Sequence, residues 1–231
     1  MSKPWKNDEE LFALMRTQLF TAVVGDIMDE LGHQRQFLPP QVQPLRDDMV
    51  VAGRAMPVLE MDDQGGEGPE RQSAVVNQPF GLMFHALDDL RPGEVYLCSG
   101  SSPEYALWGE LMSLAAGQRG AVGAVVNGYS RDTKGILAQN FPCFSWGRHA
   151  QDQRARGKVV DYRCAIRFGQ VLVRPGDIVF GDVDGVCVVP REIEDEVFVR
   201  ALEKVRGERR VFDAIKGGMK VREAWDKFGI M

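Results

Sequence analysis

The stretch from residue 108 to residue 132, WGELMSLAAGQRGAVGAVVNGYSRD, constrains the fold most, because it reads as a helix followed directly by a buried strand. A helix of about nine residues that starts at Gly109 rises roughly 13 Å, and a strand of about six residues returns roughly 20 Å. This path is expected to bring Arg131 and Asp132 beside Gly109 and Glu110. The segment therefore predicts a polar corner where the strand returns to the start of the helix.

Helix and strand patterns alternate along the rest of the chain. Apolar residues recur at helical spacing over residues 11–31, 80–90, 107–116 and 193–215. Runs typical of strands cover residues 50–59, 91–100 (after a turn), 121–126, 143–146, 159–168, 171–173, 178–181 and 186–189. We therefore expect a mixed α/β fold with strands dominating the middle, in one domain over residues 1–231 whose helical tail begins near residue 191.

The bulk properties exclude several classes of protein. The formal net charge is -5 and no long run of Lys or Arg occurs, so we expect no nucleic-acid partner. No segment approaches the roughly 20 apolar residues that span a bilayer, and residues 1–10 do not resemble a signal peptide, so we expect no membrane partner. No C-x-x-C pair occurs among Cys98, Cys143, Cys164 and Cys187, which predicts buried, reduced thiols in a cytoplasmic protein.

The predicted corner combines groups that suit a 2-oxo acid. Arg131 offers a planar fork for a carboxylate, and the backbone N–H groups at the helix start offer further donors. Asp132 suits a hard metal ion, which the carboxylate and keto oxygens of the ligand would chelate, and Glu110 is a second acid within reach. Spacing alone leaves a second reading open, in which Arg131 and Asp132 form a surface ion pair in a turn.

The motif Glu110-x20-Arg131-Asp132 resembles that of the 4-hydroxy-4-methyl-2-oxoglutarate/4-carboxy-4-hydroxy-2-oxoadipate aldolase family, which includes the RraA-like regulators of ribonuclease E. Three other stretches resemble the same family: TAVVGDIMDELG at residues 21–32, VRPGDIVFGDVDGVCVVP at residues 173–190 and GERRVFDAIKGG at residues 207–218. Together these stretches extend the resemblance over residues 21–229.

The resemblance implies an α/β/β/α sandwich of the swivelling, phosphohistidine-domain-like type, assembled as trimers or hexamers with sites between subunits. It also implies Mg²⁺ or Mn²⁺ at Asp132, pyruvate on Arg131, and Glu110 acting on the metal through water. Glu110 stands where the family more often has Asp, and Asn127-Gly128 stands where it more often has Asp-Gly. The roles of the family's residues at these positions therefore do not transfer directly to the side chains of Glu110 and Asn127. The groups expected to hold the substrate are Arg131 and the backbone near Gly109, Glu110, Leu111 and Met112.

One acid interrupts the apolar stripe of the predicted C-terminal helix. Glu208 lies within a stripe formed by Val197, Ala201, Val205, Phe212 and Ile215. Because a buried carboxylate needs a partner, two readings stay open. Glu208 pairs with an arginine such as Arg209 or Arg222, or it reaches the metal of a neighbouring subunit, directly or through water, as the resemblance of this helix implies.

The histidines give little support to a softer metal site. His33, His85 and His149 are the only histidines, and none lies at metal-ligand spacing from another. His85 is expected to be a core or edge residue of its helix. His149 follows the predicted strand at residues 143–146, and proximity to the corner stays open for it.

The leading hypothesis is a metal-dependent aldolase that cleaves a 4-hydroxy-2-oxo acid to pyruvate and a second carbonyl compound, with oxaloacetate decarboxylation by the same enolate chemistry. No Schiff base is required, so Lys134 is read as a solvated neighbour. The alternative is a non-catalytic regulator that binds ribonuclease E or a helicase, and metal-dependent pyruvate release would separate the two. A quinone methyltransferase is disfavoured because no Gly-rich cofactor loop follows the first predicted strand.

The sequence says less about the other half of the substrate. Residues 62–70, DDQGGEGPE, and residues 100–107 are expected to shape that part of the pocket. Both stretches carry acids, which disfavours a strongly anionic distal group.

Overall fold

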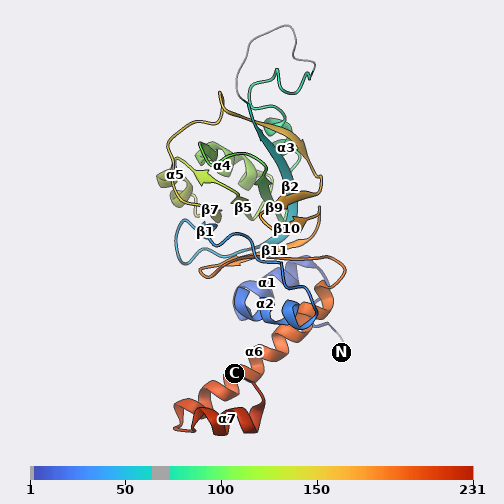
Figure 1. Cartoon of the computed structure of the whole chain (residues 1–231), viewed down its shortest axis with the longest axis vertical. Helices are drawn as coiled ribbons and strands as arrows, with labels where there is room; N and C mark the ends of the chain where they lie inside the picture. The colour runs from blue at the N-terminus through green and yellow to red at the C-terminus, as the bar shows by residue number, and fades with distance from the viewer. Residues whose placement is uncertain (1–2, 64–72, 231) are drawn as a thin grey trace.

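A computed structural model describes residues 3–63 and 73–230 of the chain (Figure 1). The helices are α1 (Asp8–Gln18), α2 (Thr21–Glu30), α3 (Met83–Asp88), α4 (Glu110–Gln118), α5 (Thr133–Ala138), α6 (Glu194–Lys216) and α7 (Val221–Phe228). The strands are β1 (Gln43–Pro44), β2 (Val51–Asp62), β3 (Glu94–Ser99), β4 (Ala106–Trp108), β5 (Gly123–Val126), β6 (Tyr129–Ser130), β7 (Cys143–Ser145), β8 (Gly157–Tyr162), β9 (Ile166–Phe168), β10 (Val171–Val173), β11 (Ile178–Asp182) and β12 (Gly185–Val189).

The long strand β2 organises the main sheet. Within the described residues, the order is β1-β7-β5-β3-β2-β11-β12, with β8 also pairing with β2. β2 pairs in parallel with β3 along one edge, while β11 and then β8 pair antiparallel along the other. The pairing with β8 shifts register between Leu59 and Glu60. Parallel strands β2, β3, β5 and β7 with intervening helices confirm the expected mixed α/β class.

Helices pack on both sides of the sheet, so the chain has two apolar clusters. Helices α1, α2 and α6 cover one side, where Val24 and Phe198 pack with Phe180 of β11. Helices α3, α4 and α5 lie on the other side in Figure 1, and their buried residues join a larger cluster that includes Trp108 and Tyr96. This second side carries the predicted polar corner.

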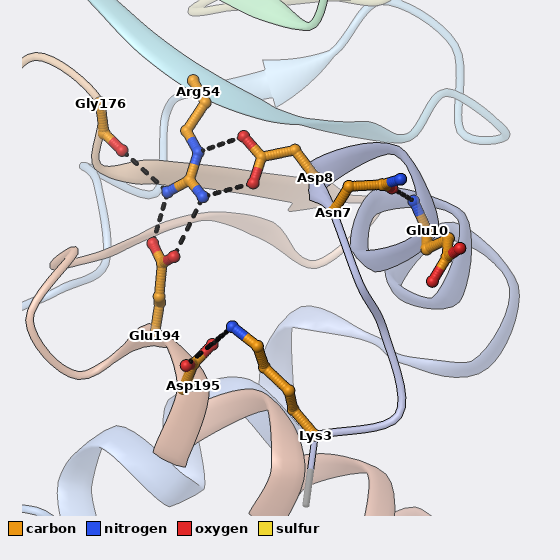
Figure 2. A network of polar contacts seen from close by, with 8 residues as sticks. All are labelled: Lys3, Asn7, Asp8, Glu10, Arg54, Gly176, Glu194 and Asp195. Atoms are coloured by element: carbon orange, nitrogen blue, oxygen red, sulfur yellow. Dashed lines mark hydrogen bonds and ion pairs between the residues drawn. The ribbon is translucent and has the colours of Figure 1, made fainter.

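One arginine ties the helices α1 and α6 to the sheet. The guanidinium of Arg54, on β2, donates from Nε and Nη2 to the carboxylate of Asp8 at 2.7 and 2.6 Å and contacts Glu194 at the start of α6 (Figure 2). Its Nη1 also donates to the carbonyl oxygen of Gly176 at 3.0 Å. The hydrogen bonds from Arg54 hold the pKa of Asp8 below its usual value. Arg54 therefore joins α1, β2 and α6 at one point.

Two boundaries differ from the sequence prediction for identifiable reasons. The single strand expected over residues 159–168 is two strands, β8 and β9, because Arg163 takes a left-handed conformation with φ 55°. The Arg163 guanidinium is held there by ion pairs with Asp89 and Glu94. The helix expected over residues 107–116 begins at Glu110, because residues 106–108 form β4 and Gly109 is extended.

The C-terminal tail is a helical hairpin rather than a single helix. After α6, which confirms the predicted long helix, α7 turns back and packs on it, with Ile230 against Gly207. In Figure 1 the end of α6 and α7 extend away from the sheet, at the opposite end of the molecule from α4 and α5. The predicted apolar stripe is buried at Val197 and Ala201 but reaches solvent at Phe212, whose side chain is 64% exposed.

Among the described residues, no single helix is long and apolar enough to cross a membrane. The bent pair of α1 and α2 passes the same test by length and composition, and its large apolar residues pack in the cluster with Phe180 and Phe198. The thiols of Cys98, Cys143 and Cys187 are buried and that of Cys164 is half-buried, and all four are free.

Candidate active site

The predicted corner forms where β4 and β6 run side by side. The backbone N–H of Arg131 donates to the carbonyl oxygen of Trp108 at 2.8 Å, which fixes the returning strand beside the start of α4. The indole of Trp108 donates to the Ser113 hydroxyl at 2.7 Å and so anchors the first turn of the helix. A Cβ atom added to Gly109 would lie 2.8 Å from Oδ2 of Asp132. The expected proximity of the helix start to Arg131 and Asp132 is therefore confirmed.

Asp132 holds an unusual backbone conformation at the start of α5. Its φ of 55° is left-handed, which costs a non-glycine residue on the order of 1 kcal/mol. Its carbonyl oxygen accepts from the N–H groups of Gly135 and Ile136 at 2.9 and 3.2 Å. Within the described residues its carboxylate caps no N–H of α5. The conformation thus leaves the carboxylate facing Gly109 and Arg131, free for another ligand.

Arg131 lies between two carboxylates. Its Nη1 donates to Oδ1 of Asp152 at 2.8 Å, and its Nε lies 3.4 Å from Oδ2 of Asp132. The side chain is 35% exposed, and its Nη2 has no partner in the described part of the chain. The guanidinium is therefore oriented from both sides while donors remain for a bound anion.

Glu110 begins α4 and lies over the first turn of α5. A Cβ atom added to Gly135 would lie 2.1 Å from Cδ of Glu110, so the Glu110 side chain occupies the space that this glycine leaves open. The Nε2 of Gln139 donates to the Glu110 carbonyl oxygen at 3.2 Å. In the described structure no side chain caps the N-terminus of α4. The first N–H groups of α4, the Glu110 side chain and Asp132 therefore lie near the starts of α4 and α5, but Glu110 does not line the cavity that opens there.

A cavity of about 410 Å³ opens at this corner. Its polar end is formed by Arg131, Asp132, Asp152 and Gln153, beside Gly109. Its larger wall is apolar and includes Phe80, Met83, Phe84, Leu87, Leu111 and Met112. Among the described residues, the prediction of which side chains shape the distal pocket is wrong except at Ala106. Of residues 100–107, Ala106 lines the cavity, whereas Asp62, Ser102, Glu104 and Tyr105 line a separate pocket, and residues 64–70 lie outside the described structure.

A buried pair supports the loop that carries Asp152. Gln153 follows Asp152, and its Nε2 donates to both carboxylate oxygens of Glu60 at 3.0 Å. Glu60 is only 2% exposed, and burial raises its pKa to about 8 although the hydrogen bonds from Gln153 oppose this shift. The pair links β2 to the residue that orients Arg131. Sequence reasoning missed Asp152 and Gln153 because no motif marks their loop.

The other candidate residues do not line the cavity, although the backbone N–H of His149 donates to the Ser130 carbonyl oxygen at 2.9 Å, one residue before Arg131. The His149 ring packs edge-on against Tyr129, with centroids 5.6 Å apart, and His149 does not line the cavity. His85 is exposed on α3 rather than a core residue. Glu208 is half-buried on α6 and forms no ion pair among the described residues, because Arg222 pairs with Asp226 instead. The expected pairing of Glu208 with Arg209 or Arg222 is therefore wrong.

Comparisons with known proteins agree on the family. A family model described as RraA-like, Aldolase/RraA, matches residues 21–188. A protein of Halalkalibacterium halodurans named "Putative 4-hydroxy-4-methyl-2-oxoglutarate aldolase" is 31% identical over 186 residues, which are 80% of this chain and 79% of that protein. Protein DlpA of Legionella pneumophila is 24% identical over 213 residues, which are 90% of this chain, but the match spans only 32% of that protein.

A solved structure supports the same fold. The crystal structure of Streptomyces coelicolor RraAS2, described as an unusual member of the RNase ES inhibitor RraA protein family, superposes with a TM-score of 0.76. The two chains are 23% identical, and the match covers 91% of this chain and 100% of that one. At this identity the likeness supports the fold alone.

Proposed function

This chain belongs to the RraA-like, Aldolase/RraA family, and we propose that it is a divalent-metal-dependent lyase that cleaves a 4-hydroxy-2-oxo acid to pyruvate and a second carbonyl compound. One observation carries the proposal. Arg131, Asp132 and the uncapped start of α4 meet at the polar end of a cavity large enough for a small substrate. Oxaloacetate, which also passes through a pyruvate enolate when it loses CO₂, is a second expected substrate.

The side chains present fit Mg²⁺ or Mn²⁺. Within the described residues, no three His, Cys, Asp or Glu side chains gather closely enough to cage an ion. Mg²⁺ does not require such a cage, because one or two carboxylates usually hold it together with water and substrate oxygens. Asp132 would hold the ion directly, and Glu110 would contact it through water. A bound ion would act as a Lewis acid toward the keto oxygen of the substrate.

Arg131 and the start of α4 would bind the substrate. The guanidinium would take the C1 carboxylate through its free donors, while Asp152 keeps its plane fixed. The amides of Glu110, Leu111 and Met112 add hydrogen-bond donors at the positive end of the helix dipole. These groups stabilise the negative charge that grows on the pyruvyl half in the transition state.

Glu110 is the proposed proton acceptor. In the cleavage the C3–C4 bond breaks, its electron pair moves into the enolate of pyruvate, and the 4-hydroxyl loses its proton as C4 becomes a carbonyl carbon. Glu110 would accept that proton through an intervening water, since it is an exposed carboxylate at the corner. The same water would return a proton to C3 and complete pyruvate.

We also infer that the chain assembles as a trimer or hexamer in which Glu208 serves a neighbouring subunit. Two observations support this arrangement: Glu208 has no ion-pair partner among the described residues, and the end of α6 lies far from α4 and α5 in one chain. A purely regulatory role draws no comparable support, because a binding protein has no need for Arg131 and Asp132 to meet at the polar end of one cavity.

Pyruvate release tests the proposal directly. The purified chain should release pyruvate from a panel of 4-hydroxy-2-oxo acids and from oxaloacetate when Mg²⁺ or Mn²⁺ is present, as measured with lactate dehydrogenase and NADH. An Asp132→Asn variant with the same circular dichroism spectrum should lose this activity. Absence of pyruvate from every compound in the panel would contradict the proposed reaction.

A further inference from the structure

We propose that Glu60 is a positioning residue for substrate binding, which acts on Arg131 through Gln153 and Asp152. The inference rests on the proposed function and deepens it, because it assigns a role in binding to a residue that does not line the cavity. The side chains of Glu60 and Gln153 are 2% and 3% exposed within one chain. A neighbouring subunit at the cavity would therefore leave their contact unchanged.

Glu60 is a buried acid without an ion pair among the described residues. An apolar side chain could fill the same place without the cost of burying a carboxyl group. In the described structure the hydrogen bonds to this carboxyl group come from Nε2 of Gln153, at 3.0 Å to each oxygen. Holding Gln153 is therefore the contribution that distinguishes Glu60 from an apolar residue.

The backbone around Glu60 is fixed from two sides. The pairing of β2 with β8 shifts register between Leu59 and Glu60, and such an irregularity redirects the side chain that follows it. On the other side, a Cβ atom added to Gly100 would lie 2.2 Å from the Glu60 carbonyl oxygen. The carboxyl group is therefore presented to Gln153 by the main sheet rather than by a loop.

Gln153 holds the segment that carries Asp152. Its carbonyl oxygen accepts from the N–H groups of Arg156 and Gly157 at 2.7 and 2.9 Å, while its side chain is bound to Glu60. Asp152 precedes it and accepts from Nη1 of Arg131 at 2.8 Å. Without the Glu60 acceptor, Nε2 of Gln153 would be buried and unpaired, so the side chain would turn and displace Asp152.

A displaced guanidinium has a specific kinetic effect. In the proposed reaction Arg131 binds the C1 carboxylate in both the substrate complex and the transition state, so misplacing it weakens both. KM should then rise while kcat changes little. A variant that is only less stable contains fewer active molecules, which lowers the apparent kcat and leaves KM unchanged. The two kinds of damage can therefore be separated.

The kinetic test compares two substitutions of Glu60. At pH 7, Glu60→Leu should raise KM for the best substrate of the panel by about tenfold and change kcat by less than about threefold. Glu60→Gln should keep KM within about threefold of wild type. Burial raises the pKa of Glu60 to about 8, so the native group is largely neutral at pH 7, and a carboxamide oxygen can also accept from Gln153.

Asp177→Leu is the matched control. Asp177 is likewise 2% exposed, accepts from the N–H groups of Arg174 and Arg191, and does not line the cavity. Its loss should lower stability and leave KM unchanged. An equal rise of KM in both leucine variants, or no rise in Glu60→Leu, would overturn the inference.

A double substitution tests the path through Asp152. If Glu60 acts through Asp152, adding Glu60→Leu to an Asp152→Ala chain should change KM by less than about twofold. A further rise of KM as large as that in the wild-type background would mean that Glu60 affects binding by another route, which contradicts the inference.

Hydrogen exchange tests the same contacts without a substrate. In Glu60→Leu the amides of Arg156 and Gly157 should exchange about tenfold faster than in wild type, and in Asp177→Leu they should exchange at the wild-type rate. If Glu60→Leu does not fold, Gln153→Leu breaks the same pair and should give the same acceleration. Unchanged exchange would overturn the inference even if the chain cleaves its substrate, whereas absence of turnover in wild type would count against the proposed reaction alone.

Discussion

Gly109 and Asp132 lie so close that a Cβ atom on residue 109 would be 2.8 Å from Oδ2 of the Asp132 carboxylate. The contact joins the start of α4 to the start of α5, so a side chain at residue 109 would push the Asp132 carboxylate aside. It makes the position of Asp132 depend on a glycine in another element. This dependence gives a substitution test that leaves every charged group in place.

Gly109→Ala should lower pyruvate release by about tenfold to a hundredfold, because a displaced carboxylate no longer meets the substrate correctly. Gly117→Ala is the control on the same helix, where the nearest atom to the new Cβ lies 3.9 Å away, on Phe141. The control should keep its activity and gain up to about 1 kcal/mol of stability in thermal unfolding. Similar activity of the two variants would show that the Gly109 contact is not needed for catalysis.

Arg131→Lys should be nearly inactive although it preserves the charge. A lysine is a point charge and cannot place two parallel N–H groups on a carboxylate, so the loss should be on the order of 2–5 kcal/mol in kcat/KM. Arg119→Lys, at an exposed ion pair with Asp88, is the matched control and should behave as wild type. A lysine variant within about twofold of wild type would remove Arg131 from the site, since the predicted loss corresponds to at least about thirtyfold.

Glu60 should make the stability of the chain depend on pH. Burial raises its pKa from 4.5 to about 8, so the folded chain holds a proton that the unfolded chain releases between these values. The contribution of Glu60 to the free energy of unfolding is therefore complete below about pH 4.5. It is lost as pH rises toward 8, by up to about 1.4 kcal/mol per pH unit. Urea unfolding measured at several pH values should show that the free energy of unfolding falls less steeply over this range for Glu60→Gln than for wild type. Parallel curves would mean that Glu60 does not retain its proton.

Asp132→Ala and Glu208→Ala should complement each other if sites lie between subunits. Each variant alone should be weak, because each damages every site. Mixed oligomers made by unfolding the variants together and refolding them would contain some sites with neither change, so activity should return and should be greatest when the two variants are mixed in equal amounts. Each variant refolded alone is the control, and size-exclusion chromatography checks that both assemble. Activity equal to the average of the two parents would place Glu208 outside a shared site.

The sequence predicted the corner because helix and strand have fixed rises, so a nine-residue helix and the strand behind it must bring Arg131 back to Gly109. It could not predict the support from Asp152 and Gln153, because these residues lie in a loop whose path depends on the buried partner Glu60. The part of the cavity wall that comes from α3 was also missed, since α3 joins α4 only through tertiary packing.

The predicted boundaries of helices and strands were wrong where a single side chain fixes the backbone conformation. Arg163 reads as part of a continuous strand, yet its ion pairs with Asp89 and Glu94 hold a left-handed turn that divides β8 from β9. The short helix α5 depends in the same way on the left-handed Asp132. The hairpin formed by α6 and α7 was missed because its second helix is short and mostly exposed.

The most direct test of the central claim is metal-dependent pyruvate release by the chelated protein. After exhaustive treatment with EDTA, turnover of the preferred 4-hydroxy-2-oxo acid should fall to background, and Mg²⁺ or Mn²⁺ should restore it, because Asp132 offers a hard oxygen ligand and no thiol or imidazole cluster is present among the described residues. The Asp132→Asn variant should not recover. Full activity in the chelated wild type would contradict the account.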